Sequence, residues 1–211
     1  MDKKTKARDI ISKLSTYYTN PKSSLNFTTP LELLIATMLS AQTTDKLVNQ
    51  ITPFLFSKYL NVEDFAKADY EELDKIINKV NFHRNKAKSI ISASKMIVEK
   101  YSSNVPDTME ALITLPGVAR KTANVVLGNA YQKAEGIAVD THVVRLSKKL
   151  GLTDNSDPIK IEKDLMNLIP RKNWISFSHM LILFGREFCP ARPHTCPDCP
   201  LKDLCPDLAK S

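Results

Sequence analysis

Four cysteines near the end of the chain could bind a metal: Cys189, Cys196, Cys199 and Cys205. They follow the spacing C-x6-C-x2-C-x5-C, which gathers four soft sulfur ligands in residues 189–205. Such a segment indicates a metal or iron–sulfur site. Structural zinc is usually held by two C-x2-C pairs, whereas this segment contains one, and its wider spacings favour a [4Fe-4S] cluster. Zinc and free thiols are the alternatives, and His194 is expected at the surface.

A second candidate is the short turn Leu115-Pro116-Gly117-Val118, which lies between two stretches of helical periodicity. Pro116 ends the first stretch, and Gly117 can adopt a positive φ. The next helix then begins with free backbone N–H groups and a positive dipole end, which suit a phosphate. Arg120 and Lys121 add positive charge. The turn predicts a contact with the DNA backbone, and an ordinary helix–helix connection is the alternative.

The rest of the sequence is helical in its periodicity. Apolar residues recur three and four positions apart, and strict two-residue alternation does not persist. We therefore predict an all-α chain of roughly ten helices. The clearest stretches are 31–39, 86–99, 108–115, 120–131, 141–150, 159–169 and 174–186.

Capping residues mark several of the expected helix ends. Thr29-Pro30 and Asp157-Pro158 are typical of a helix start, as is Asp107 before Thr108. Gly151 is expected just after a helix that ends at Leu150. The cysteine segment also carries several prolines, which predicts that it is not a regular helix.

Composition narrows the class of protein. The chain is 43% hydrophobic and 25% charged, as in ordinary globular proteins, and it has 211 residues, enough for a sizeable core. With only 5 glycines it could hardly build a β-sandwich, a Rossmann loop or a Walker loop. The net charge of +7 favours an anionic partner such as nucleic acid or an acidic membrane surface, with a merely solubilising excess as the alternative.

Location is expected to be cytoplasmic. The sequence has no run of eighteen apolar residues, and Met1 to Arg8 is polar and lysine-rich, unlike a secretion signal. This predicts a soluble, intracellular protein without a membrane partner. A reducing cytosol keeps thiols free, which favours cysteines as ligands over disulfides.

Taken together, several motifs resemble endonuclease III, the bifunctional DNA glycosylase and AP lyase of the helix-hairpin-helix superfamily. The likeness spans residues 39–205, nearly the whole chain. It rests on Leu39-Ser40-Ala41-Gln42 with Asp45, Arg84-Asn85-Lys86-Ala87, the Leu-Pro-Gly-Val turn with Lys121, Val139-Asp140-Thr141-His142-Val143 with Arg145, and the cysteine spacing.

The resemblance implies a mechanism. Lys121 would attack the sugar C1′ and form a Schiff base, and partial burial beside Arg120 would favour its neutral amine. Asp140 would accept a proton or stabilise the oxocarbenium-like sugar. The alternatives are purely structural: Lys121 would be a solvated surface charge, and Asp140 would be a helix N-cap without a chemical role. His142 and Arg145 are expected to brace the contact between domains.

The resemblance also implies how DNA is bound. The substrates would be oxidised pyrimidines and abasic sites in double-stranded DNA, extruded from the stack. Gln42 and Phe82 would fill the gap, and Arg192, in the cysteine loop, would contact the backbone. The hairpin contact would come from Leu115, Gly117, Ala119 and Arg120.

Two positions depart from the family pattern. Ala119 stands where a second glycine is frequent, which suits the phosphate turn only if its φ is not left-handed. Asn81-Phe82-His83 replaces a turn that more often begins with glycine.

The implied architecture is two helical lobes with a cleft between them, across which Lys121 and Asp140 would face one another. The first is a six-helix domain with the hairpin, residues 23–133. The second joins 1–22 to 134–211 and carries the iron–sulfur cluster. An enzyme of this size could act as a monomer. The alternatives are a monofunctional mismatch glycosylase, which Lys121 argues against, and a non-catalytic iron–sulfur DNA-binding protein.

Overall fold

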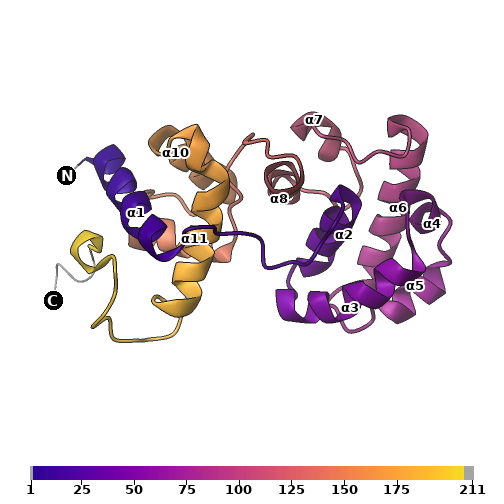
Figure 1. The fold of residues 1–211 in the computed structure, drawn as a ribbon, viewed down its shortest axis with the longest axis horizontal. Coiled ribbons are helices and arrows are strands. Elements are labelled where there is room, and N and C mark those ends of the chain that lie inside the picture. The colour runs from indigo at the N-terminus through magenta and orange to yellow at the C-terminus, as the bar shows by residue number, and fades with distance from the viewer. Residues whose placement is uncertain (1, 207–211) are drawn as a thin grey trace. The chain divides into compact units, whose positions relative to one another are not determined.

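The computed structural model describes residues 2–206, which form eleven α-helices and two short 3-10 helices and contain no β-strand (Figure 1). The all-α prediction is confirmed. The chain divides into two compact units, residues 23–135 and residues 1–22 with 136–211. The boundary drawn from the sequence, between 133 and 134, falls two residues before this division. No helix in the described part of the chain has the length and apolar character to cross a membrane.

The unit of residues 23–135 is built around one fully enclosed helix, α2. Its residues 33–39 are all buried, since α3, α6 and α8 pack around it. Such a helix is apolar on every side because no face meets water. The helices of this unit are α2 (Pro30–Ser40), α3 (Asp45–Lys58), α4 (Val62–Ala66), α5 (Tyr70–Ile76), α6 (His83–Tyr101), α7 (Met109–Leu112) and α8 (Arg120–Ala130).

The long helix α6 is the second organising element of this unit. It packs against α2, α4 and α5. Its buried stripe runs through Ala87, Ile90, Ala93 and Ile97, three or four residues apart. The stripe begins one residue earlier, at Lys86, which is only 8% exposed. A lysine at the head of an apolar stripe needs partners for its charge.

The second unit packs its helices around α11. Both α1 and α9 contact α11, and their apolar faces share one core with it. The helices are α1 (Lys3–Tyr17), α9 (Thr141–Lys149), α10 (Pro158–Leu168), η1 (Arg171–Asn173), α11 (Trp174–Glu187) and η2 (Lys202–Leu204). After α11, the described part of the cysteine segment holds only the short η2, as its prolines predicted.

The capping residues confirm most of the expected helix ends. Thr29 and Asp157 cap α2 and α10, each followed by proline. Gly151 follows α9 with φ +69°, the left-handed conformation expected there. The expectation for Asp107 is wrong. Thr108 caps α7 instead, since its side chain accepts the Ala111 N–H, and Asp107 forms an ion pair with Lys133.

Candidate functional site

The predicted hairpin forms the connection between α7 and α8. The Val118 N–H donates to the Leu115 carbonyl at 3.0 Å, which closes a four-residue turn. Gly117 has φ +78°, as the third residue of a type II turn requires, and proline precedes it. A Cβ at Gly117 would lie 2.7 Å from Cβ of Ser89 and 3.0 Å from Cε of Met38. Both the φ value and the close packing therefore require glycine.

The N-terminus of α8 directly follows this turn and has no side-chain cap. Ala119 is its N-cap residue, with φ −90° and ψ 168°, an extended conformation that any L-residue adopts. Alanine is therefore compatible with the turn, and a second glycine is not needed. Eight other helices in the described part of the chain have a side chain that caps their N-terminus. An exposed helix start without a cap suits an external anion.

Leu115 does not contribute its side chain to this surface, since it is 2% exposed and belongs to the core of its unit. The expected DNA contact at Leu115 is therefore limited to its backbone. The physical reason is that the turn needs an apolar anchor where it packs on the helices beneath it.

Lys121 is the second residue of α8, and its side chain is exposed. The expectation that it is partly buried is wrong. Lys121 lies outside the buried face of α8, which includes Ala123, Val126 and Leu127. The amine is therefore open to a ligand that approaches the hairpin surface.

Asp140 caps α9 in the other unit, where one carboxylate oxygen accepts the Val143 N–H at 2.9 Å. The side chain is half-buried. The negative charge of Asp140 acts on His179, a buried residue of α11. Burial lowers the pKa of His179, and the Asp140 charge opposes that shift. Lys121 and Asp140 belong to different units, and their expected approach to one another stays a prediction.

Gln42 and Phe82 are both exposed and both have left-handed backbones, with φ 55° and 57°. They lie in the loops that follow α2 and precede α6. Asn81 joins these loops: its backbone N–H donates to Oγ1 of Thr43 at 3.2 Å, and its side-chain amide donates to the Gln42 carbonyl. The two expected gap-filling residues, 40 positions apart in sequence, are thus held on adjacent loops.

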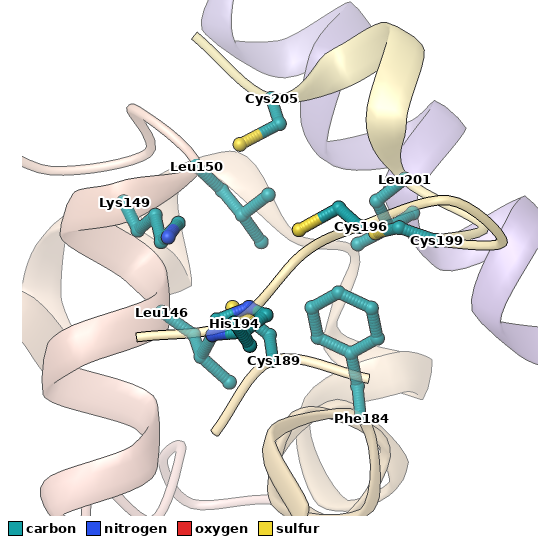
Figure 2. Close-up of a pocket in the computed structure, with 10 residues that line it drawn as sticks. All are labelled: Leu146, Lys149, Leu150, Phe184, Cys189, His194, Cys196, Cys199, Leu201 and Cys205. Carbon is teal, nitrogen blue, oxygen red and sulfur yellow. The ribbon is translucent and has the colours of Figure 1, made fainter. Parts of the chain in front are cut away.

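The four cysteines line one cavity of about 100 Å³ (Figure 2). Cys189 and Cys205 are buried, and Cys196 and Cys199 are half-buried. Burial and the neighbouring thiols raise the pKa of Cys199. Apolar side chains complete the wall: Leu146, Leu150, Phe184 and Leu201.

The cavity fits a bound cluster by the chemistry of its donors. Four thiols converge on it from one loop, and the apolar wall would shield a cluster from water. His194 also lines the cavity, so the expectation of a surface histidine is wrong. Its buried Nε2 has no hydrogen-bond partner within residues 2–206, while Nδ1 lies 2.8 Å from the Arg192 carbonyl. Among residues 2–206, no three His, Cys, Asp or Glu side chains are grouped to hold a single metal ion.

Arg145 binds the first residues of the cysteine loop. Its guanidinium donates to the Cys189 carbonyl at 2.6 Å and to the Pro190 carbonyl at 3.5 Å, within its own unit. It therefore ties α9 to the start of the cysteine loop, and the expected bracing between domains stays a prediction. Arg192 is exposed further along the loop.

Comparison with known proteins identifies the family. Residues 35–171 match the family described as HhH-GPD superfamily base excision DNA repair protein. Endonuclease III of Synechocystis sp. is 49% identical over 209 residues, covering 99% of this chain and 95% of that relative. Endonuclease III of Bacillus subtilis is 44% identical over 196 residues, covering 92% and 89%. The solved "Structure of a Trapped Endonuclease III-DNA Covalent Intermediate: Estranged-Adenine Complex" matches with a TM-score of 0.93 and 41% identity, over 100% of this chain and 99% of that one.

The helical fold and its hairpin define the class, a helix-hairpin-helix protein of base excision DNA repair. Within that class, the near full-length matches at 38–49% identity are specific. The chain belongs to the endonuclease III family. It is a DNA glycosylase of base excision repair, in a family for which AP lyase activity is typical.

Sequence reasoning missed the residues that hold the two exposed loops together, chiefly Lys86, Asn81 and Thr43. One signal was available: Lys86 falls four positions before Ile90, on the apolar stripe of its helix. A lysine on an apolar stripe predicts a buried charge with nearby acceptors. No sequence pattern could have identified those acceptors, which come from residues more than forty positions away.

We predict that Gly117→Ala will distort the hairpin. The new Cβ is strained by the positive φ and collides with Ser89, so the free energy of unfolding should fall by about 1–3 kcal/mol. Affinity for duplex DNA should fall with it. Urea denaturation and fluorescence anisotropy measure the two effects.

The matched control is Ala119→Gly, two residues later, where the extended backbone accepts either residue. It should change both measurements only slightly. Equal affinities for wild type and Gly117→Ala would contradict a role for the turn in binding DNA.

Proposed function

We propose that this glycosylase removes oxidised or ring-damaged pyrimidines from duplex DNA and then cuts the strand, with Lys121 as the nucleophile. The observation that carries this proposal is the position of Lys121. It is an exposed amine in the first turn of an uncapped helix, beside a turn suited to phosphate. DNA bound at that turn would bring its sugars close to the amine and exclude water from it.

The proposed chemistry uses one amine and proceeds through a covalent intermediate. The Lys121 lone pair attacks C1′ while the glycosidic bond breaks and the damaged base leaves with its electrons. Ring opening of the sugar then gives a Schiff base. Loss of a proton from C2′ expels the 3′ phosphate, and hydrolysis of the imine releases Lys121.

Asp140 would act on the same nucleotide in this proposal. One carboxylate oxygen is engaged with the Val143 N–H, and the second oxygen can accept the amine proton or face the developing positive charge on the sugar. The cap fixes the side chain in orientation, so the structural role supports the chemical one.

Access to the damaged base requires that it leave the stack and that the gap be filled. We assign this filling to Gln42 and Phe82, because both are exposed on adjacent loops of one unit. Phe82 is 61% exposed, so its ring is accessible to a bound duplex. Gly117, Ala119 and Arg120 would bind the backbone phosphate beside them.

The four cysteines would hold a [4Fe-4S] cluster in the cavity that they line. When bound, the cluster supplies a cross-link that orders the loop. Within that loop Arg192 is exposed and would contact the DNA backbone, while Arg145 fixes its first residues to α9. We place this activity in the cytoplasm, at the nucleoid, because its substrate is chromosomal DNA.

We expect Lys121→Gln to abolish covalent trapping. Borohydride reduces a Schiff base to a stable amine, so wild type should become cross-linked to an abasic-site duplex, and the variant should stay at background. Lys100→Gln, an exposed lysine on α6, is the matched control and should trap normally. Trapping by Lys121→Gln would remove this residue from the mechanism.

Two substitutions at Asp140 separate its cap from its chemistry. Asp140→Asn keeps an oxygen for the Val143 N–H and removes the charge, so stability should be retained while the single-turnover rate falls by about 100-fold or more. Asp140→Ala should reduce the single-turnover rate by the same factor and, in addition, lower the free energy of unfolding by about 1 kcal/mol. If the Asp140→Asn enzyme had the wild-type rate, Asp140 would have no chemical role and would act only as the N-cap of α9.

Metal analysis tests the cluster. Protein purified without oxygen should be brown and hold about four iron and four sulfide ions per chain. Removal of the cluster should unfold the cysteine loop and weaken DNA binding, measured by circular dichroism and anisotropy. One zinc per chain in iron-free, active protein would show the alternative site.

A further inference from the structure

The two exposed loops of residues 40–44 and 80–83 carry backbone strain at their tips. Gln42 and Phe82 both have positive φ, although neither is glycine. Such residues are uncommon and persist only where the surrounding structure over-determines them. The positive φ values of Gln42 and Phe82 therefore indicate that other contacts hold both loops in these conformations.

Those contacts come from two side chains. Asn81 donates from its backbone to Thr43 and from its side chain to the Gln42 carbonyl. Lys86 donates to the carbonyls of Leu39 at 2.7 Å and Ala41 at 2.6 Å. It also reaches Oγ1 of Thr43, at 3.3 Å. We call these bonds from Asn81 and Lys86 the loop clamp.

The ammonium of Lys86 matches this site closely. An ammonium has three N–H donors, and three oxygens accept them. Two of these oxygens are carbonyls at the C-terminus of α2, where a positive charge is favoured by the helix dipole. Burial lowers the pKa of Lys86 to about 8, so the charge is held at a penalty in solvation. An apolar residue would fill the same space without that penalty, which argues that the geometry of the bonds is what the position requires.

A second anchor lies on the other side of Phe82. Nδ1 of His83, the first residue of α6, lies 2.5 Å from a carboxylate oxygen of Asp74 on α5. The wedge residue is thus held at both flanks, by Asn81 and by His83. The side chains of Asn81 and His83 are therefore both engaged in contacts with other segments of the unit.

We propose that Asn81 and Lys86 are positioning residues that lock the two loops together, so that Gln42 and Phe82 enter the duplex as one preformed wedge. The inference rests on the proposed gap-filling function and adds the residues that make it efficient. Two independent loops would have to be ordered when the base leaves the stack, at the moment when unstacking already opposes binding. With the clamp, that ordering precedes DNA binding.

The test compares two DNA substrates for each variant. A lesion duplex requires base extrusion and gap filling, whereas an abasic site in a single-stranded oligonucleotide requires the Lys121 chemistry but presents no gap. Extrusion in the duplex is followed by the fluorescence of 2-aminopurine beside the lesion. Asn81→Ala should slow extrusion and duplex turnover about tenfold, since it removes the side-chain bond to the other loop, and leave single-strand nicking within about twofold.

Control variants at exposed positions and a second pair of clamp variants accompany Asn81→Ala. Asn78→Ala, an exposed asparagine three residues earlier, should behave as wild type on both substrates. Lys86→Met should resemble Asn81→Ala, with Lys95→Met, at an exposed position of the same helix, as its control. If Lys86→Met fails to fold, Thr43→Val removes the oxygen that both clamp residues share, and should give the same selective loss.

Phe82→Ala separates the two hypotheses. If it impairs extrusion and Asn81→Ala does not, the clamp is wrong and the gap-filling function stands. If Phe82→Ala extrudes the base normally, the gap-filling function is wrong and the clamp proposal falls with it. Equal losses by Asn81→Ala on both substrates would indicate a general structural role and would also overturn the proposal.

Discussion

The buried ammonium of Lys86 beneath the end of α2 is the interaction on which the arrangement of the larger unit depends. The last carbonyls of a helix have no partner within the helix and need other donors. Lys86 satisfies two of them from α6. Hydrogen bonds to a charged group contribute about 1.5–3 kcal/mol each, while burying an ion costs several kcal/mol, so the two terms nearly cancel. What is gained is a fixed distance between α2 and α6.

The exposed loops and the hairpin of that unit are also positioned by α2 and α6. Gln42 follows α2, and Phe82 precedes α6. Gly117 packs between Met38 of α2 and Ser89 of α6, and the α8 N-terminus with Lys121 begins three residues later. The hairpin and the two exposed residues Gln42 and Phe82 are therefore positioned by the same pair of helices. The distance between them depends on how these helices pack in the core.

In the second unit, the described part of the cysteine segment after α11 has little regular structure. Its order must therefore come from other interactions. Four thiols around one cavity can replace a hydrophobic core for such a loop when a cluster binds them. The Arg145 contacts with the carbonyls of Cys189 and Pro190 join that loop to α9. Because α9 is capped by Asp140, the helix connects the cysteine loop to the carboxylate of the proposed mechanism.

The sequence by itself determined the helical class, most of the caps, the cysteine set and, through its motifs, the family. These depend on local periodicity, on residue type and on short spacings, which survive without tertiary contacts. Helices α1, α3, α4 and α5 were not among the stretches read from periodicity, and α4 and α5 are too short to show more than two turns. Only the tertiary structure decided that Leu115 is buried, that Lys121 is exposed, that Arg145 contacts the cysteine loop and that His194 lines the cavity. The same holds for the Lys86 contacts, because each joins residues far apart in the chain, and which side chains meet there is set by the packing of whole helices.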